Sequence, residues 1–428
     1  MLLARVYPML QEHEAGNQRR LLVREDHHEP QEGPPRRPKV AGQGLAGTPN
    51  LGAQYEYAAG ELHRTDTIGN DQMSGKPKKL VPGVSAIDLF CGVGGMTHGL
   101  VKEGIRVVAG IDNDASCKYA YEKNNSAKFI EADIRKLKAS DVHAFYPKGH
   151  KRILVGCAPC QPFSGYTSKQ PKGDKWNLLY SFADLIERIE PDIISMENVP
   201  GLIRFKTPPI FDEFVKRLEA AKYEVSHSIV YCPDYGVPQT RSRLVLFASK
   251  LGKIEIIPKT RKKDQYKTVS ETIGHLPVID HGQICPKDLL HRAAKLADIN
   301  LERIQATPAA GGWKDWDKRL VLKCHSKKKG RRYCSVYGRM NADAPAPTMT
   351  TLCTGIGNGR FGHPDQDRAI SLREAALFQT FPMSYDFVNP DRKFSAKVIA
   401  RQIGNAVPVQ LGKVVARSIK AHLEAHSG

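Results

Sequence analysis

The sequence of 428 residues lacks any uninterrupted apolar run close to the roughly 20 residues that a membrane-spanning helix needs. Its first residues, 1–5, lead into charged sequence and not into the apolar region of a signal peptide. It also lacks internal repeats with a period of about 20 to 50 residues. We therefore expect a globular cytoplasmic protein with no membrane partner.

The nine cysteines follow no regular spacing, which is typical of reduced thiols and argues against a disulfide framework. Cys157 and Cys160 form a CxxC pair, but no second CxxC or HxxxH pair follows at zinc spacing. We expect no metal site, and a redox or metal role for this pair is the weaker alternative.

Positive charge is in excess, and the excess is local. The formal net charge is +19, which favours a polyanionic partner such as nucleic acid. Residues 251–340 contain 20 Lys or Arg against 9 Asp or Glu, whereas residues 1–80 are nearly balanced, with 11 against 10. Such a local excess is what a docking surface for a polyanion requires.

Composition and hydrophobic periodicity divide the chain into four parts. Residues 1–80 contain seven Pro and nine Gly without helical or strand periodicity, which predicts a disordered extension, and Met73 is a plausible alternative start. Residues 81–250 alternate short apolar runs with helical patterns. Residues 251–365 are basic and aperiodic, which indicates a second, smaller domain. In residues 366–428 helical patterns resume, and we expect this segment to rejoin the first domain.

The alternation in the second part predicts a doubly wound, mostly parallel α/β sheet. The expected strands are 84–90, 106–111, 128–131, 153–155, 192–196 and 243–247, and the expected helices are 96–103, 115–123 and 178–189. In such sheets ligands bind at the carboxyl ends of the strands.

Two acids and a glycine turn lie at these strand ends. The turn 92–95 follows the first strand, where it would let a ligand approach the backbone, and Asp112 at the next strand end could bind ribose hydroxyls. Gly94 and Gly95 are adjacent and His98 replaces the third glycine of GxGxxG, so a single nucleoside fits better than a dinucleotide. Asp133 would meet the base of that ligand, or would only cap the following turn.

A proline-framed cysteine follows the apolar run 153–155. Pro159 and Pro162 would stiffen the loop and hold the Cys160 thiol at the sheet edge, where a nucleophile is useful. The alternative is that Cys160 is a small buried apolar residue, as most free cysteines are.

An acid and two arginines complete the set. Glu197 ends a buried strand, where loss of water favours its protonated form and suits it to share a proton with a ring nitrogen. Arg241 and Arg243 alternate along a strand and would point the same way, which is favourable if an anion or carbonyl lies between them. The alternatives are a loop carboxylate and a solvated strand edge.

Together these segments resemble the DNA (cytosine-5)-methyltransferase family, in the family's motif order from Val84 to the C-terminus. The resemblance rests on six segments: 88–95 (DLFCGVGG), 159–164 (PCQPFS), 196–199 (MENV), 239–243 (QTRSR), 373–382 and 404–407 (GNAV).

The resemblance implies a Rossmann-like, S-adenosylmethionine-dependent fold with a DNA-recognition domain, and it implies roles for the residues. The Cys160 thiolate would add to cytosine C6, Glu197 would hold N3, and Arg243 with Arg241 would hold the O2 side. The implied cofactor contacts are Phe90, Gly92, Gly94, Asp112, Asp133, Pro159, Leu178, Asn405 and Val407. Asp112 replaces the glutamate that is common in the family.

The implied substrate is duplex DNA with the target cytosine flipped out of the helix. Gln161, Ser164, Asn198 and Gln239 are the expected substrate contacts, and Thr348–Leu352 lies where the family reads its target. The candidates for base contacts are Arg331, Arg332, Arg339 and Arg360. We expect a monomer located with the nucleoid, with a cognate restriction endonuclease as a further possible partner.

Three other functions compete with this interpretation. An RNA cytosine-5 methyltransferase would use the same motifs, although the long basic region favours duplex DNA. A non-catalytic DNA-binding regulator would not need the full set of Cys160, Glu197 and Arg243. A nicotinamide-dependent oxidoreductase is disfavoured by the glycine pattern.

Overall fold

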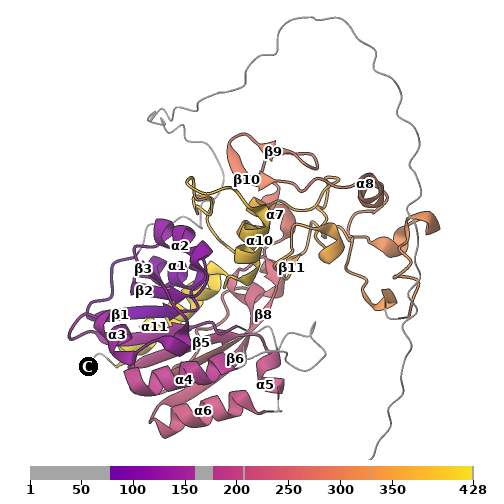
Figure 1. Ribbon diagram of the computed structural model, residues 1–428. Helices are drawn as coiled ribbons and strands as arrows, with labels where there is room; N and C mark the ends of the chain where they lie inside the picture. Colours follow the sequence, from indigo (N-terminus) through magenta and orange to yellow (C-terminus); the bar gives the residue numbers. More distant parts are fainter. Residues whose placement is uncertain (1–77, 160–176, 206–207, 329, 427–428) are drawn as a thin grey trace, which may run out of the picture. The chain divides into compact units, whose positions relative to one another are not determined.

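A seven-stranded β-sheet organises the structure, a computed structural model that describes residues 78–159, 177–205, 208–328 and 330–426. The strand order is β3-β2-β1-β4-β5-β8-β6 (Figure 1). The strands are β1 (Val84–Leu89), β2 (Arg106–Asp112), β3 (Lys128–Glu131), β4 (Lys151–Gly156), β5 (Ile193–Asn198), β6 (Glu224–Tyr231) and β8 (Ser242–Ser249).

Strand directions agree with the expected doubly wound, mostly parallel sheet. The strands β1 to β5 run parallel to one another, whereas β8 runs antiparallel to both of its neighbours, β5 and β6. The chain order reverses between β1 and β4, because β2 and β3 extend to one side and β5 to the other. This reversal marks the place where ligands bind in such sheets.

Helices cover both faces of the sheet. Alternate residues of β1 point to opposite faces, so Ala86 packs with α1 (Gly95–Lys102) and α11 (Val409–Ala425), whereas Ile87 packs with α3 (Ala139–Ala144), α4 (Asn177–Ile189) and α6 (Ile210–Ala220). Two buried faces explain why the strands have continuous apolar sequences.

Two features differ from the expected elements. The helix expected at 115–123 is a 3₁₀ turn, Ala115–Cys117, followed by α2 (Lys118–Asn124), because the Asp114 side chain accepts hydrogen bonds from Ser116 and caps the first turn. The edge strand β6 was not expected, since most of its residues are exposed or half-buried and it lacks the apolar sequence of a covered strand.

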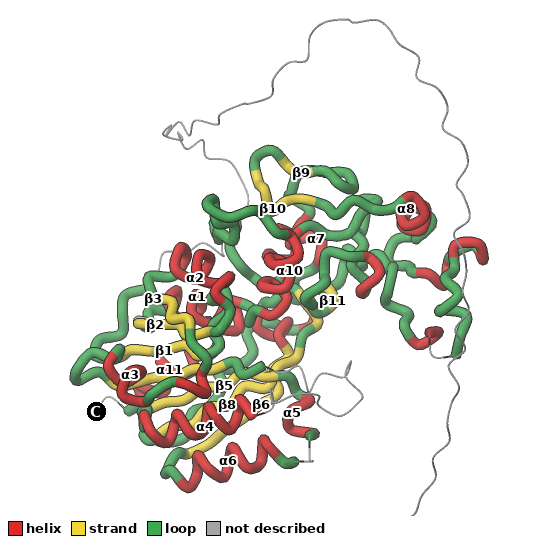
Figure 2. The backbone as a smooth tube through the Cα atoms, in the orientation of Figure 1, coloured by secondary structure: helices red, strands yellow, loops and turns green. Residues whose placement is uncertain are grey.

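Residues 250–365 contain little regular structure, as the green tube around β9, β10 and α8 shows (Figure 2). Here the elements of at least four residues are α7 (Val269–Ile273), β10 (Asp288–Arg292) and α8 (Asp298–Gln305). The shorter strands are β9 (Ile284–Cys285) and β11 (Ala346–Pro347), and β11 pairs with β7 (Gln239–Thr240). In the described ranges no helix is long and apolar enough to cross a membrane.

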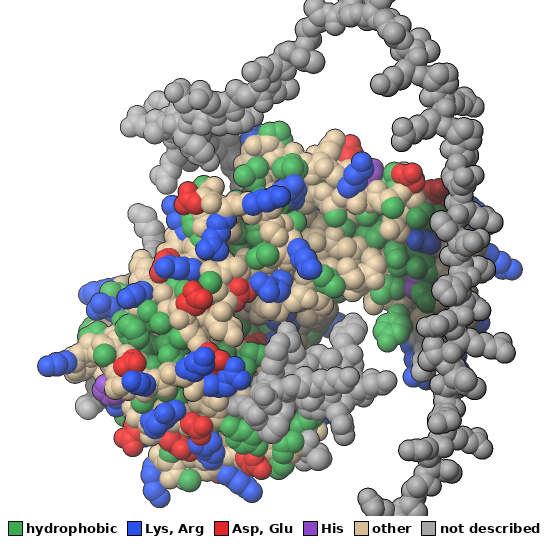
Figure 3. All heavy atoms as spheres, viewed as in Figure 1, with side chains coloured by type: hydrophobic (Ala, Val, Ile, Leu, Met, Phe, Trp, Pro, Cys, Tyr) green, Lys and Arg blue, Asp and Glu red, His purple; other side chains and the backbone are tan. Residues whose placement is uncertain are grey.

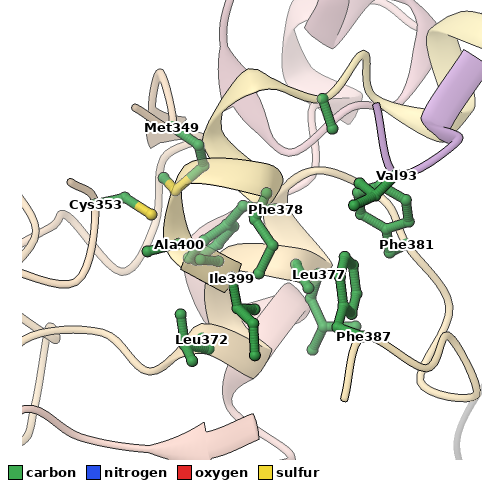
Figure 4. Close-up of a cluster of buried hydrophobic side chains, with 14 of the residues drawn as sticks. Val93, Met349, Cys353, Leu372, Leu377, Phe378, Phe381, Phe387, Ile399 and Ala400 are labelled. Atoms are coloured by element: carbon green, nitrogen blue, oxygen red, sulfur yellow. The ribbon is translucent and has the colours of Figure 1, made fainter. Parts of the chain in front are cut away.

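The helices α9 (Leu372–Phe378) and α10 (Ala396–Asn405) enclose a third apolar core. Phe378, Phe381 and Ile399 pack there with Met349 from the preceding loop and with Val93 from the turn after β1 (Figure 4). The remaining short helix, α5 (Gly201–Arg204), follows β5. This third core joins the last part of the chain, residues 366–428, to the part that contains β1, β2 and β3.

Buried ion pairs hold α9 in place. Arg368, which is fully buried, donates to both carboxylate oxygens of Glu374 at 2.9 and 2.7 Å. Glu374 also accepts from the backbone N–H of Ser371 and so closes the capping box of α9. Arg373 binds both oxygens of Asp288 in β10 at 2.6 and 3.0 Å. The start of the motif 373–382 therefore connects α9 to β10 and has a structural role.

The Glu374→Gln substitution is expected to lower the free energy of unfolding by about 3–5 kcal/mol, because it leaves the Arg368 guanidinium buried without its counter-charge. The matched control is Glu302→Gln, which breaks the exposed pair with Arg319 and should cost less than about 1 kcal/mol. Urea unfolding of the three proteins measures the difference, and equal losses in the two variants would contradict the expectation.

Candidate active site

A cavity of about 300 Å³ opens at the carboxyl ends of β1, β2, β4 and β5, where the strand order reverses. Most of the expected site residues that the structure describes line it together. They are Phe90, Gly92, Asp112, Pro159, Leu178, Glu197, Asn198, Arg241, Arg243, Asn405 and Val407. Residues separated by more than 300 positions in the sequence therefore share one site.

The turn after β1 begins with a strained backbone. Phe90 has φ 59°, a left-handed conformation that is rare for a bulky residue and is found mostly at functional sites. Asp112 fixes the turn, because its two carboxylate oxygens accept the backbone N–H groups of Gly92 and Asp114, both at 2.9 Å. Burial raises the pKa of Asp112 above its ordinary value, against the lowering effect of these hydrogen bonds.

Two expected cofactor residues lie away from the cavity lining. Gly94 is the N-cap of α1 with φ 87°, so it shapes the turn. Asp133 caps the 3₁₀ turn Ile134–Lys136 through the backbone N–H of Arg135, and the Arg135 guanidinium holds the pKa of Asp133 below its usual value. The capping alternative for Asp133 is thus the arrangement that the structure contains.

The helix α10 and the residues that follow it form part of the cavity wall. Gly95 packs so tightly against this segment that a β-carbon there would lie 2.1 Å from the Val407 carbonyl oxygen. From α10, Arg401 pairs with Asp114 at 2.8 Å and Gln402 donates to the Ser116 carbonyl at 3.0 Å. Sequence reasoning missed these two residues, although they lie one helical turn before Asn405 and so on the same face of α10.

Glu197 and Arg243 form an ion pair inside the cavity. Arg243 Nε lies 2.8 Å from Glu197 Oε1, and the two side chains are 12% and 9% exposed. Oε1 accepts no hydrogen bond among the described residues, so the contact is an ion pair without hydrogen-bond geometry. Arg243 also donates to the Ser242 carbonyl at 2.8 Å. A carboxylate and a guanidinium thus present complementary charges to the same space.

Asn198 connects the Glu197 strand to the cysteine loop. Its side-chain amide donates to the Ala158 carbonyl at 3.2 Å, and its oxygen accepts the backbone N–H of Val199 at 2.9 Å. The loop therefore leaves β4 at a point fixed by β5. Cys160, Gln161 and Ser164 lie outside the described residues.

Arg241 and Gln239 bind backbone groups of the later segments. Arg241 is 3% exposed and donates to the carbonyls of Met349 and Ala406 at 3.3 and 3.4 Å. Gln239 is fully buried; its amide nitrogen donates to the Phe378 carbonyl at 2.7 Å and its oxygen accepts the N–H of Met349 at 3.1 Å. Gln239 was expected to contact the substrate; in the structure it is not among the residues that line the cavity, and its hydrogen bonds fix the position of Met349 in loop 346–353.

Asp88 is a buried acid that sequence reasoning quoted only as part of a motif. It borders the cavity and is fully buried, and its Oδ2 accepts a 2.6 Å hydrogen bond from Thr97. Its Oδ1 has no hydrogen-bond partner among the described residues. Burial, opposed by the Thr97 hydrogen bond and assisted by the nearby Asp112, raises the pKa of Asp88 to about 7.

The arrangement is that of an α/β fold with a cavity at the switch point and a charged pair that lines it. Residues 84–421 match the family of C-5 cytosine-specific DNA methylases. Because the match covers most of the chain, the protein belongs to this family and is a DNA cytosine-5 methyltransferase.

Individual relatives agree with this assignment. The chain is 57% identical to the Type II methylase M.HgiDII of Herpetosiphon aurantiacus over 340 residues, which are 79% of this chain and 96% of the relative. It is 27% identical to the Type II methyltransferase M1.HphI of Haemophilus parahaemolyticus, over 78% of this chain and 86% of the relative. A DNA modification methyltransferase encoded within an E. coli prophage has the same fold, with a TM-score of 0.58 and 21% identity over 80% of this chain and 99% of that one.

The raised pKa of Asp88 predicts how its contribution to stability depends on pH. The unfolded chain releases this proton near pH 3.8 and the folded protein near pH 7, so Asp88 destabilises the fold increasingly between these values and fully above pH 7. The Asp88→Asn substitution removes this penalty and keeps an oxygen that can accept from Thr97.

The stability of the variant relative to the wild type should therefore rise between pH 4 and pH 7, by up to about 4 kcal/mol. Urea unfolding of both proteins at several pH values measures this change. A difference that stays constant with pH would show that Asp88 does not titrate in this range.

Proposed function

We propose that this methyltransferase transfers the methyl group of S-adenosylmethionine to C5 of a flipped-out cytosine in a specific duplex DNA sequence, through a covalent bond between Cys160 and C6. The observation that carries the proposal is the shared cavity. The Glu197–Arg243 pair and the Asp112 turn border one space, and Pro159, which directly precedes Cys160 in the sequence, lines the same space.

The lining residues fit the methyl donor. Each Asp112 oxygen accepts one backbone N–H and retains capacity for a ribose hydroxyl, because a carboxylate oxygen can accept two hydrogen bonds. Phe90, Leu178 and Val407 supply apolar walls, and Asn405 and Pro159 complete the rim. S-adenosylmethionine supplies an electrophilic methyl group on a sulfonium when it is bound. We assign Gly94 a role in shaping the turn, and we propose Asp133 as a contact to the base end of the cofactor, beyond the residues that line the cavity.

The protein groups would act on the cytosine in sequence. The Cys160 thiolate forms a bond to C6, and the electron pair of the C5–C6 bond becomes available at C5. Glu197 brings a proton to N3 and shares it with the ring as negative charge develops there, while Arg243 holds the O2 side. C5 takes the methyl group, its proton then leaves, and the returning electron pair breaks the bond between C6 and sulfur.

Substrate access requires the cytosine to leave the helix, at a cost of a few kcal/mol that contacts elsewhere must offset. We propose that residues 251–365 form the target-recognition region that makes these contacts, with Gln161 and Ser164 close to the base. Arg241, Gln239 and Asn198 would position this region and the loop. The Type II names of the relatives suggest a cognate restriction endonuclease, and we propose a monomer that acts at the nucleoid.

The proposal is tested with purified protein, tritiated S-adenosylmethionine and either duplex DNA or tRNA. We expect label on DNA only, and none with Cys160→Ser, because the serine hydroxyl is a far weaker nucleophile than a thiolate. Bisulfite sequencing of the product identifies the target sequence. Label on RNA only, or label on DNA that persists in Cys160→Ser, would contradict the proposal.

The covalent step has its own test in DNA that carries 5-fluorocytosine at the target. Because C5 then holds fluorine in place of the proton that must leave, the Cys160–C6 bond should persist after methyl transfer. We expect a protein–DNA band on a denaturing gel for the wild type and none for Cys160→Ser. Failure of the wild type to form this band on a sequence that it methylates would exclude the covalent route.

The Gly95→Ala substitution should weaken binding of S-adenosylhomocysteine, the demethylated product, by about tenfold or more. A β-carbon at this position would meet the Val407 carbonyl and displace the rim of the cavity. The control is Gly312→Ala, at an extended position with φ −166° where a β-carbon would lie no closer than 3.4 Å to its neighbours. Isothermal titration calorimetry measures both variants, and unchanged affinity in Gly95→Ala would show that this contact does not shape the site.

A further inference from the structure

The four arginines that are candidates for reading DNA bases have different surroundings. Arg339 is 6% exposed, and all five of its N–H donors are used inside the protein. They bind the carbonyls of Thr307, Ile304, His363 and Gln366 at 2.7 to 3.0 Å, and the carboxylate of Asp367. Arg360 is half-buried and donates to the carbonyls of Ala310 and Gly311, both at 2.6 Å. These two arginines hold the recognition region together.

Arg331 and Arg332 are exposed instead. They lie in what we call the basic loop, residues 323–328 and 330–334. This loop also contains Lys323, Lys327 and Lys328, which are exposed as well. No acidic residue pairs with these cations in the part of the chain that the structure describes, and the basic loop itself has no Asp or Glu. The surface over α4 and α6 differs, because acidic and basic side chains are intermixed there (Figure 3).

Trp313 fixes the basic loop at two points. Its indole N–H donates to the Tyr333 carbonyl at 2.8 Å, and its ring stacks on His325 with 4.5 Å between ring centroids. Trp313 is itself buried with Trp316 and Leu320. Inside the loop, the N–H of Arg331 donates to the Lys327 carbonyl at 3.1 Å. The cations therefore lie on a backbone that is already ordered, so less conformational entropy is lost when the loop binds a partner.

Backbone contacts connect the basic loop to the wall of the catalytic cavity. After the loop, the N–H of Tyr337 donates to the Ile356 carbonyl at 2.7 Å. Ile356 belongs to the segment that begins at Met349, whose carbonyl accepts from Arg241. Thr350 in that segment packs against Gly404 of α10, where a β-carbon would lie 2.3 Å from the Thr350 carbonyl. The basic loop thus belongs to the same framework as the site.

We infer that the basic loop contacts the duplex beside the target cytosine, with Lys327 and Lys328 on phosphates and Arg331 and Arg332 on base edges. This inference rests on the proposed function for its DNA substrate. Arginine reads guanine in the major groove through O6 and N7, so the recognised sequence should contain guanine. Tyr333, which is 55% exposed, adds an aromatic surface beside the two arginines.

Three double variants test the inference. Lys327→Ala with Lys328→Ala and Arg331→Ala with Arg332→Ala change the basic loop. Lys148→Ala with Lys151→Ala serves as the control. It removes two exposed charges near the start of β4, at the end of this strand that is remote from the cavity. Fluorescence anisotropy measures the affinity for a duplex that holds the bisulfite-identified sequence and for an unrelated duplex, at several salt concentrations. A random duplex library with bisulfite readout measures specificity.

The lysine variant should bind both duplexes more weakly, and the slope of log affinity against log salt should fall by about 2. The arginine variant should lose about 5- to 150-fold in affinity for the target duplex for each base contact removed, and should methylate additional sequences. The control should match the wild type, and binding of S-adenosylhomocysteine should be unchanged in all three.

The inference is overturned if the loop variants match the control in affinity, salt dependence and methylated sequences while the wild type still methylates DNA. Equal weakening on both duplexes in the arginine variant would refute the assignment to base edges. A wild type that methylates no DNA at all would instead remove the proposed function, so the two failures are distinguishable.

Discussion

The antiparallel insertion of β8 beside β5 is the constraint on which the rest of the site depends. It pairs Glu197 with Val245 and Asn198 with Leu244, so Arg243 arrives next to Glu197 although 46 positions separate them in the chain. A parallel strand at this position would begin at the other edge of the sheet, and its first residues would lie far from the carboxyl ends of β4 and β5. The charged pair therefore exists because one strand runs against the others.

The residues before β8 extend this constraint to loop 346–353 of the proposed recognition region. Gln239 and Arg241 bind the backbone of Met349, and Arg241 also binds Ala406, so two segments distant in sequence meet at the motif QTRSR. A buried amide and a buried guanidinium are costly to leave unpaired, and each carbonyl they bind is thereby fixed in place. The chemistry at Glu197 and the loops that would choose the target sequence are thus held by the same few side chains.

Much of this site could be predicted from the sequence. The apolar strands, the glycine turn and Asp112 are local patterns, and eleven of the expected residues line one cavity. Phe90, Asp112 and Glu197 reach it because parallel strands end at one edge of the sheet. Gln239 shows the limit, since a polar residue in a motif can serve the substrate or the fold, and only its buried partners tell which. Asp133 is similar, because capping a turn and binding a base require the same carboxylate.

The sequence by itself determined the type of fold, the order of the motifs and the location of the basic excess, because strand periodicity, turn residues and charge are written in neighbouring positions. Only the tertiary structure decided that Arg339 is buried and Arg331 is exposed. Both arginines follow a glycine in the sequence, but only Arg339 is surrounded by carbonyl groups from distant segments. It also decided the exposure of Asp88, whose titration depends on burial. Pairing, burial and access arise between distant segments, and no local pattern encodes them.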